Sequence, residues 1–242
     1  MIFLRGIGLV ISFILIWQLS IYFFKFPPYI VPSPYLVFMS LIQNSLLISQ
    51  QAVPTLIETF LGLFLGALLG LSTALMMIFF RPIKLWFLPL LLISQALPTF
   101  AIAPLFIIWF GYGMASKIAI TIIMLFFPVA SAFYDGLRRT PRDYLDLAKT
   151  MQATHWQLLK RIQIPYALPS LATGLRVAAT IAPIGAVIGE WVGSSSGLGF
   201  LLLNANARMQ IDLMFAVLIV ITMFTLFLYY SIDWLLKTLI TW

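Results

Sequence analysis

Long apolar segments follow one another along the chain, and short polar stretches separate them. A helix needs about 20 consecutive apolar residues to cross the hydrocarbon core of a bilayer, and each segment approaches or exceeds that length. The pattern therefore predicts an all-α, polytopic membrane protein with six transmembrane helices. The six predicted spans are residues 6–24, 55–80, 85–110, 116–133, 166–192 and 211–236.

The first apolar segment has two interpretations. Arg5 followed by residues 6–24 resembles the start of a secretory signal peptide. The segment is longer than the apolar core of a typical signal, however, and residues 25–28 (Lys-Phe-Pro-Pro) lack the small residues of a cleavage site. We therefore expect an uncleaved first span.

Residues 27–50 are too polar to cross the membrane, although apolar residues recur there at helical spacing. This pattern predicts a short amphipathic helix that lies at the membrane surface. Its apolar positions are Leu36, Met39, Ile42, Leu46 and Leu47, and the opposing polar positions are Ser40, Gln43 and Asn44.

Glycine and proline distinguish two of the predicted spans. Gly62, Gly66 and Gly70 share one face of the second span, a spacing that lets another helix approach closely. Prolines in the third span free backbone carbonyl groups, which is typical of helices that line cavities; kinks that serve packing alone are the alternative. The prolines are Pro89, Pro98 and Pro104.

The composition excludes a soluble globular protein. Hydrophobic residues make up 62% of the chain, charged residues 9%, and the mean hydropathy is +1.07, whereas soluble domains have about 45–50% apolar and about 25% charged residues. The chain has no cysteine, which excludes a disulfide framework and a thiolate metal site. We interpret the net charge of +7 as a topology signal and expect no nucleic acid as a partner.

The distribution of Lys and Arg predicts the orientation in the membrane. With the N-terminus in the cytoplasm, ten basic residues lie on the cytoplasmic side and three on the opposite side, so both termini are predicted to be cytoplasmic. The ten are Arg5, Arg81, Lys84, Arg138, Arg139, Arg142, Lys149, Lys160, Arg161 and Lys237. The three are Lys25, Lys117 and Arg208, and Arg176 falls inside a span.

Residues 134–165, which we call the coupling loop, form the one long hydrophilic stretch and hold nine of the 21 charged residues. Apolar positions recur in it at helical spacing and predict short helices with an apolar face. A solvated connector is the alternative, but a connector needs only a few residues. We therefore expect a docking surface for a cytoplasmic protein. The apolar positions include Leu145, Ala148, Met151, Trp156, Leu159 and Ile162, with Gln152 beside them.

The coupling loop resembles a motif of the permease subunits of binding-protein-dependent ABC importers. That motif is Glu-Ala-Ala, three residues, Gly, nine residues and Ile-x-Leu-Pro. Here residues 146–148 (Asp-Leu-Ala), Gln152 and residues 162–165 (Ile-Gln-Ile-Pro) stand at its three parts with the spacing kept. The acid is shortened, one alanine is leucine and the glycine is glutamine. Residues 167–170, 173–176 and 189–199 are similar to the nitrate, sulfonate and taurine branch of that family.

The resemblance implies a type I ABC importer permease fold, with residues 1–242 as one transmembrane domain. It implies a multi-pass protein of a prokaryotic inner membrane that works as a pair of copies, expected to be a homodimer, with two cytoplasmic ATPase subunits and an extracytoplasmic binding protein. The chain has no phosphate-binding GxxxxGK[ST] loop. It is therefore expected to be a transport subunit without cofactor or enzymatic activity, and ATP and Mg²⁺ would bind the ATPase. The residues expected to contact the ATPase are Leu145, Asp146, Ala148, Met151, Gln152, His155 and Trp156.

Polar residues within the spans are candidates for the translocation path: Ser94, Gln95, Thr99, Arg176 and Glu190. For Arg176 the alternatives are a side chain that reaches the cytoplasmic interface or tethers a loop. Glu190 is expected to pair with Arg208 or Lys117, or to meet water. The same alternatives hold for Glu58, and there contact with water is preferred. His155, the single histidine, cannot form a zinc site alone.

The substrate is the least constrained part of this interpretation. Residues 181–193 and 204–210 are similar to permeases for hydroxymethylpyrimidine, a thiamine precursor, and alkanesulfonates, taurine and nitrate are the alternatives. A secondary transporter without an ATPase is the alternative class. Such a transporter usually carries ionisable groups at the middle of its spans, and here only Arg176 lies there.

Overall fold

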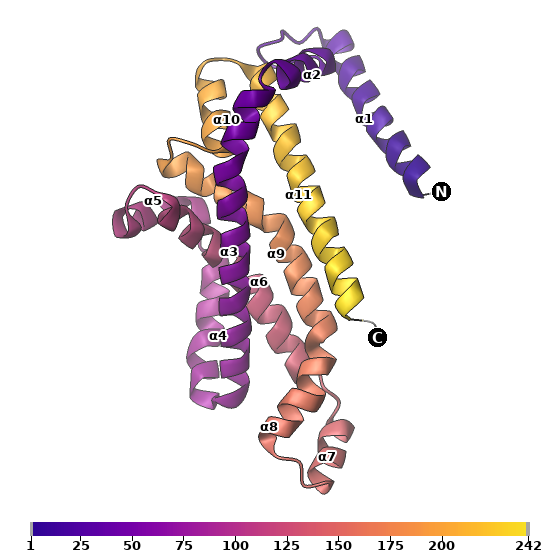
Figure 1. Cartoon of the computed structure of the whole chain (residues 1–242), viewed down its shortest axis with the longest axis vertical. Coiled ribbons are helices and arrows are strands. Elements are labelled where there is room, and N and C mark those ends of the chain that lie inside the picture. Colours follow the sequence, from indigo (N-terminus) through magenta and orange to yellow (C-terminus); the bar gives the residue numbers. More distant parts are fainter. Residues whose placement is uncertain (1, 241–242) are drawn as a thin grey trace.

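The structure, a computed structural model, describes residues 2–240, and for residues 2–7, 9, 10, 81, 88, 92 and 94–96 it describes the backbone alone. Within residues 2–240 every regular element is a helix, which confirms the all-α prediction (Figure 1). In chain order the elements are α1 (Ile2–Phe24), α2 (Pro34–Gln43), α3 (Ser45–Phe79), α4 (Arg81–Ala96), α5 (Thr99–Phe110), α6 (Met114–Arg138), α7 (Arg142–Thr150), α8 (His155–Leu158), the π-helical turn η1 (Leu159–Gln163), α9 (Ile164–Gly193), α10 (Leu198–Ala207) and α11 (Ile211–Leu239).

Helices α3, α6 and α9 pack closely and form the centre of the molecule. The predicted glycine face of α3 lies against α6: a Cβ atom at Gly66 would stand 3.0 Å from the Cβ of Leu125, and one at Gly70 would stand 2.9 Å from the Cβ of Val129. Gly62 meets Thr121 in the same way. The close approach that the glycine spacing predicts is therefore confirmed.

The boundary between α2 and α3 differs from the prediction. The Ser33 hydroxyl caps α2 by accepting a hydrogen bond from the Leu36 amide, and Asn44 ends α2 by donating to the Ser40 carbonyl. The surface helix was predicted to continue to residue 50, but from Ser45 the chain belongs to α3. Because Pro54 is accommodated inside that helix, α3 begins ten residues before the predicted start at 55.

The third predicted span is divided into two helices. Pro98 disfavours helical geometry at the residue before it, and Leu97 accordingly adopts an extended conformation (φ −76°, ψ 124°) that ends α4. After this break α5 turns away from the direction of α4 (Figure 1). The expectation of one continuous helix over residues 85–110 was wrong.

Among the described residues, four helical segments are long and apolar enough to cross a membrane: Ser45–Phe79, Met114–Arg138, His155–Gly193 and Ile211–Leu239. Helix α1 and the divided pair α4–α5 stand at the places of the other two predicted spans. The count of six transmembrane helices stays a prediction.

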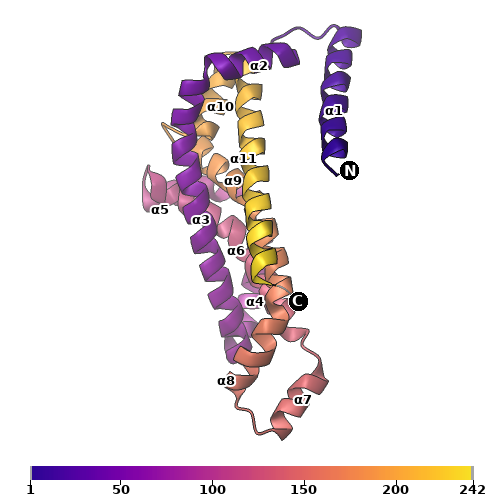
Figure 2. The ribbon, with the colours of Figure 1, turned by 45° about the vertical axis from the view of Figure 1, so that its right-hand side comes forward.

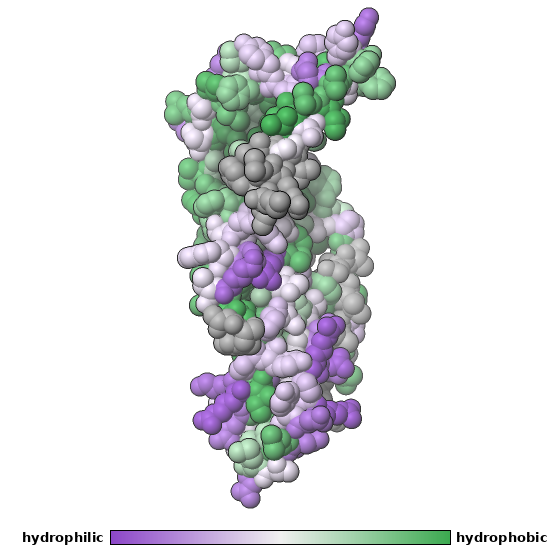
Figure 3. Space-filling view, turned by 90° about the vertical axis from the view of Figure 1, so that its right-hand side faces the viewer, coloured by the Kyte–Doolittle hydropathy of each residue, from purple (hydrophilic) through white to green (hydrophobic). Residues whose placement is uncertain are grey.

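The two ends of the long axis carry different elements. Helices α7 and α8 lie beyond the membrane-spanning helices at one end, and α2 and α10 lie toward the other (Figures 1 and 2). Hydrophilic side chains gather at the α7–α8 end (Figure 3). The N-terminal end of α1 and the C-terminal end of α11 both point toward that end, as two cytoplasmic termini require, but their sidedness stays a prediction.

Candidate functional site

The coupling loop folds into two short helices that project from one end of the molecule (Figure 1). Helix α6 continues to Arg138, five residues past the predicted end of its span. Helices α7 and α8 follow, and the π-helical turn η1 leads without interruption into α9. Movement of this hairpin is therefore linked through helical backbone to one of the central helices.

The glutamine at the glycine position of the motif has left-handed backbone geometry. Gln152 has φ +59°, the region that glycine adopts most readily. Its amide donates to the Lys149 carbonyl (2.9 Å), and the Ala153 amide donates to the Ala148 carbonyl (3.0 Å). These two bonds form a Schellman motif, which ends α7. Glycine adopts this backbone shape at the lowest cost, and this chain keeps the shape with glutamine.

The apolar face of α7 does not point entirely outward. Ala148 is only 7% exposed and Leu145 is half-buried, so this chain already covers the position at which we expected the ATPase to seat. Other apolar side chains point outward instead: Leu147 is 60% exposed and Met151 is 75% exposed. The outward set on α7 therefore includes Leu147, which the sequence interpretation left out, and excludes Ala148.

Asp146 and Lys149 form an exposed ion pair on α7. The Lys149 ammonium donates to the Asp146 carboxylate at 2.8 Å. This hydrogen bond and the charge of Lys149 lower the pKa of Asp146 below its ordinary value. The carboxylate is ionised at neutral pH and available to a partner.

Helix α8 is tied to the end of α3. Thr154 and Gln157 form a reciprocal capping box at its start. The exposed Trp156 stacks on Phe79, the last residue of α3, with ring centroids 5.9 Å apart. His155 is exposed beside it. The coupling loop thus contacts α3 as well as continuing into α9.

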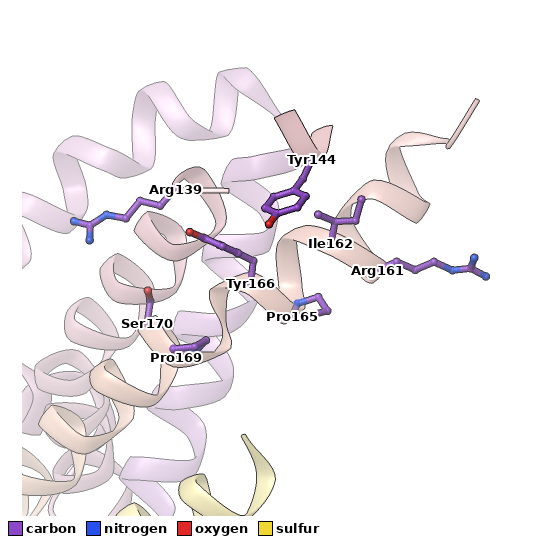
Figure 4. Close-up of a pocket in the computed structure, with 8 residues that line it drawn as sticks. All are labelled: Arg139, Tyr144, Arg161, Ile162, Pro165, Tyr166, Pro169 and Ser170. Carbon is purple, nitrogen blue, oxygen red and sulfur yellow. The ribbon is translucent and has the colours of Figure 1, made fainter. Parts of the chain in front are cut away.

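A cavity of about 660 Å³ opens between the coupling loop and the start of α9 (Figure 4). Its lining residues are Arg139, Tyr144, Arg161, Ile162, Pro165, Tyr166, Pro169 and Ser170.

The candidate path residues do not form one site. Ser94 and Gln95 lie outside the residues whose side chains are described, and Thr99 is the first residue of α5, where it is half-buried. Arg176 donates from Nε to the Asp233 carboxylate of α11 at 2.7 Å, and Lys237 pairs with the same carboxylate at 2.6 Å. This geometry favours a tether between α9 and α11. The sequence interpretation missed Asp233, although its spacing of four residues from Lys237 was a signal.

Glu190 anchors the segment that connects α9 to α10. Its carboxylate accepts from the Thr55 hydroxyl (2.6 Å) and from the Gly199 amide (2.5 Å), and Thr55 in turn accepts from the Leu198 amide (2.8 Å). Glu190 is 1% exposed. Among the described residues it forms no ion pair with Lys117 or Arg208, so the expected contacts with a cation or with water were wrong.

Glu58 and Lys117 form a buried ion pair between α3 and α6, with 2.6 Å between the Lys117 ammonium and the carboxylate. Glu58 is fully buried, so the preferred expectation that it meets water was wrong and the alternative, a pair with a cation, is found. Lys117, counted among the basic residues of the side opposite the cytoplasm, is removed from solvent by this pair. The described residues offer no group of three or more possible metal-ligating side chains.

Comparison with known proteins identifies transport permeases in each case. The family described as "Binding-protein-dependent transport system inner membrane component" matches residues 62–241. A probable ABC transporter permease protein of Haemophilus influenzae is 53% identical and covers 94% of this chain and 93% of its own length. A formylaminopyrimidine transport permease protein of Halalkalibacterium halodurans is 41% identical over 76% of this chain and 74% of its own length.

The fold also matches solved structures. A chain of the MetNI methionine ABC transporter, in an inward-facing conformation, aligns with a TM-score of 0.68 and 18% sequence identity. The alignment covers 81% of this chain and 97% of that one. At this identity the likeness concerns the fold alone.

Proposed function

The chain belongs to the family of binding-protein-dependent transport system inner membrane components, and from this premise we propose how it imports its solute. Members of this family are multi-pass permease subunits of ABC transporters, and they are not themselves enzymes. We propose that two copies of the chain form the membrane path. Two cytoplasmic ATPases would drive it with ATP and Mg²⁺, and an extracytoplasmic binding protein would deliver the solute.

The feature that carries this proposal is the exposed apolar surface of α7. Leu147 and Met151 project from a short helix at the end of the molecule where hydrophilic residues gather, and exposed apolar groups of this kind favour a protein partner. Asp146 adds an ionised carboxylate beside them. An ATPase groove with apolar walls and a hydrogen-bond donor for this carboxylate fits that surface.

Force from the ATPases has two routes into the membrane. One runs through η1 into α9, and the other runs through the stack of Trp156 on Phe79 into α3. Because α3, α6 and α9 are packed at glycine contacts with little free space, we expect them to move as one body. Rocking of this body between the two copies would expose the path alternately to the two sides.

Our proposed substrate is hydroxymethylpyrimidine or a closely related thiamine precursor. The support is the 41% identity to a permease named for formylaminopyrimidine, together with the similarity of residues 181–193 and 204–210. Alkanesulfonates, taurine and nitrate are the alternative substrates.

Uptake of labelled hydroxymethylpyrimidine and taurine in cells that lack this chain, with and without the restored gene, tests the proposal. We expect the restored cells to take up the pyrimidine and to lose that uptake when ATP is depleted at constant membrane potential. Uptake that follows the potential and persists without ATP would instead indicate a secondary transporter. Uptake of taurine alone would reject the proposed substrate.

A further inference from the structure

The cavity beside the coupling loop lies at the level where the membrane-spanning helices end. Arg139 directly follows the last residue of α6, and Arg161 precedes the first residue of α9 by three positions. The cavity, at about 660 Å³, has room for a group much larger than a water molecule. With the predicted orientation, this position lies near the cytoplasmic boundary of the membrane.

Arg139 and Arg161 give the cavity a positive charge that no acidic lining residue balances. Among the described residues no ion pair joins Arg139 or Arg161 to a carboxylate, which is also true of Arg142 and Lys160 outside the cavity. In Figure 4 the stems of Arg139 and Arg161 begin on opposite sides of the cavity and their guanidinium groups point away from it, so each side chain must turn inward to meet an anion there.

The wall of the cavity is apolar and aromatic. Tyr144 comes from α7 and Tyr166 from α9, so two different helices each contribute a tyrosine to the wall (Figure 4). Pro165 and Pro169 complete much of the remaining wall. Tyrosine combines an apolar ring with a polar hydroxyl and is favoured where membrane meets water. A ligand of this cavity should therefore have an anionic group and an apolar part.

We propose that this cavity binds a phosphate-bearing amphiphile, with the phosphate held between Arg139 and Arg161 and the apolar part against the tyrosine and proline wall. Both guanidinium groups sit on long flexible stems and can turn to the phosphate. An anionic phospholipid of the cytoplasmic leaflet has this chemistry, and basic pockets between helices on that side of a membrane bind such headgroups. A soluble organic phosphate shares the phosphate chemistry but lacks the long apolar chains. The inference does not rest on the identity of the imported solute.

Native mass spectrometry of the intact purified protein tests the proposal, after reconstitution in equal amounts of phosphatidylglycerol and phosphatidylcholine. We expect the wild-type protein to retain phosphatidylglycerol about fivefold over phosphatidylcholine. The double variant R139Q/R161Q should lose this preference. The matched control R142Q/K160Q removes the same charge from the same end of the chain, outside the cavity, and should keep it. Equal retention by both double variants would overturn the proposal.

A second experiment distinguishes a phospholipid ligand from a soluble organic phosphate. Glycerol 3-phosphate, added to protein in phosphatidylcholine alone, should protect neither the wild type nor Y166S against thermal unfolding if the ligand is a lipid. In that case Y166S should lose phosphatidylglycerol. If the wild type shows no lipid preference but is stabilised by glycerol 3-phosphate, and R139Q/R161Q is not, the phosphate site stands and its ligand is soluble. If the wild type neither prefers phosphatidylglycerol nor is stabilised by glycerol 3-phosphate, the proposal is overturned.

Discussion

At the scale of single residues, Gln152 occupies a position at which the backbone favours glycine. A residue with a Cβ atom costs about 1–2 kcal/mol in left-handed geometry, and Gln152 has φ +59°. We predict that Q152G stabilises the end of α7 by about 1 kcal/mol, after the greater flexibility of glycine in the unfolded chain is subtracted. The Ala153 amide, bonded to Ala148, should then exchange its hydrogen about fivefold more slowly, the rate ratio that corresponds to about 1 kcal/mol.

The same substitution at a helical glutamine is the control. Gln157 lies in α8 and takes part in its capping box, so Q157G should destabilise the coupling loop. If Q152G and Q157G accelerate exchange equally, left-handed geometry at Gln152 does not matter.

The ion pair between Arg176 of α9 and Asp233 of α11 predicts that loss of each residue changes stability by a different amount. Asp233 also pairs with Lys237, so R176L leaves the carboxylate with one cation. D233L leaves Arg176 without its carboxylate partner, 12 residues into α9 or about 18 Å along the helix. We predict that D233L lowers the thermal unfolding temperature in lipid nanodiscs more than R176L does, because an unpaired cation inside the span costs more than a carboxylate that keeps one cation. A larger loss in R176L would contradict this account.

Residue types were easier to predict than residue contacts. The sequence shows the coupling loop, its acidic residue Asp146 and the replacement of the motif's glycine by Gln152. Burial of Ala148 and pairing of Glu58 with Lys117 are not, because both depend on neighbours that are distant in the sequence. Glu58 and Lys117 are separated by 59 positions, and the chain between them carries no local signal of their contact.

At the scale of elements, the glycine face of α3 predicts a steric effect. G66L would place a side chain where Leu125 and the backbone of Ile122 already lie, with 3.0 Å from a Cβ to the nearest atom. We expect a loss of about 3 kcal/mol or more, because the helices must separate. G8L is the matched control, because a Cβ at Gly8 meets nothing within 4 Å. Equal thermal stability of G66L and G8L would show that α3 and α6 tolerate separation.

The helices themselves were largely predictable, whereas their interruptions were less so. Apolar segments of about 20 residues identify α6, α9 and α11 because length and hydropathy decide membrane helices. The break at Leu97 had a visible cause in Pro98, but prolines also occur inside continuous helices, as Pro54 does in α3. Sequence alone does not distinguish these cases, since neighbouring helices decide whether the lost hydrogen bond is tolerated.

At the scale of the whole molecule, the central claim is that the coupling loop docks the ATPase. The loop reaches α3 by a ring stack and α9 by continuous helix, so it is placed to move the centre of the protein. Family membership supports the transport role, and the outward side chains of α7 define the surface to test.

Capture of the ATPase by the permease tests this claim most directly. L147E/M151E places two charges on the outward face of α7, where docking would leave them unpaired. The control M209E places one charge at a side chain that is 64% exposed in the turn after α10. We predict that L147E/M151E inserts normally, captures at least about tenfold less ATPase and loses solute uptake in proportion, while M209E captures the wild-type amount. Undiminished capture and uptake by L147E/M151E would contradict the assignment of this loop as the coupling element.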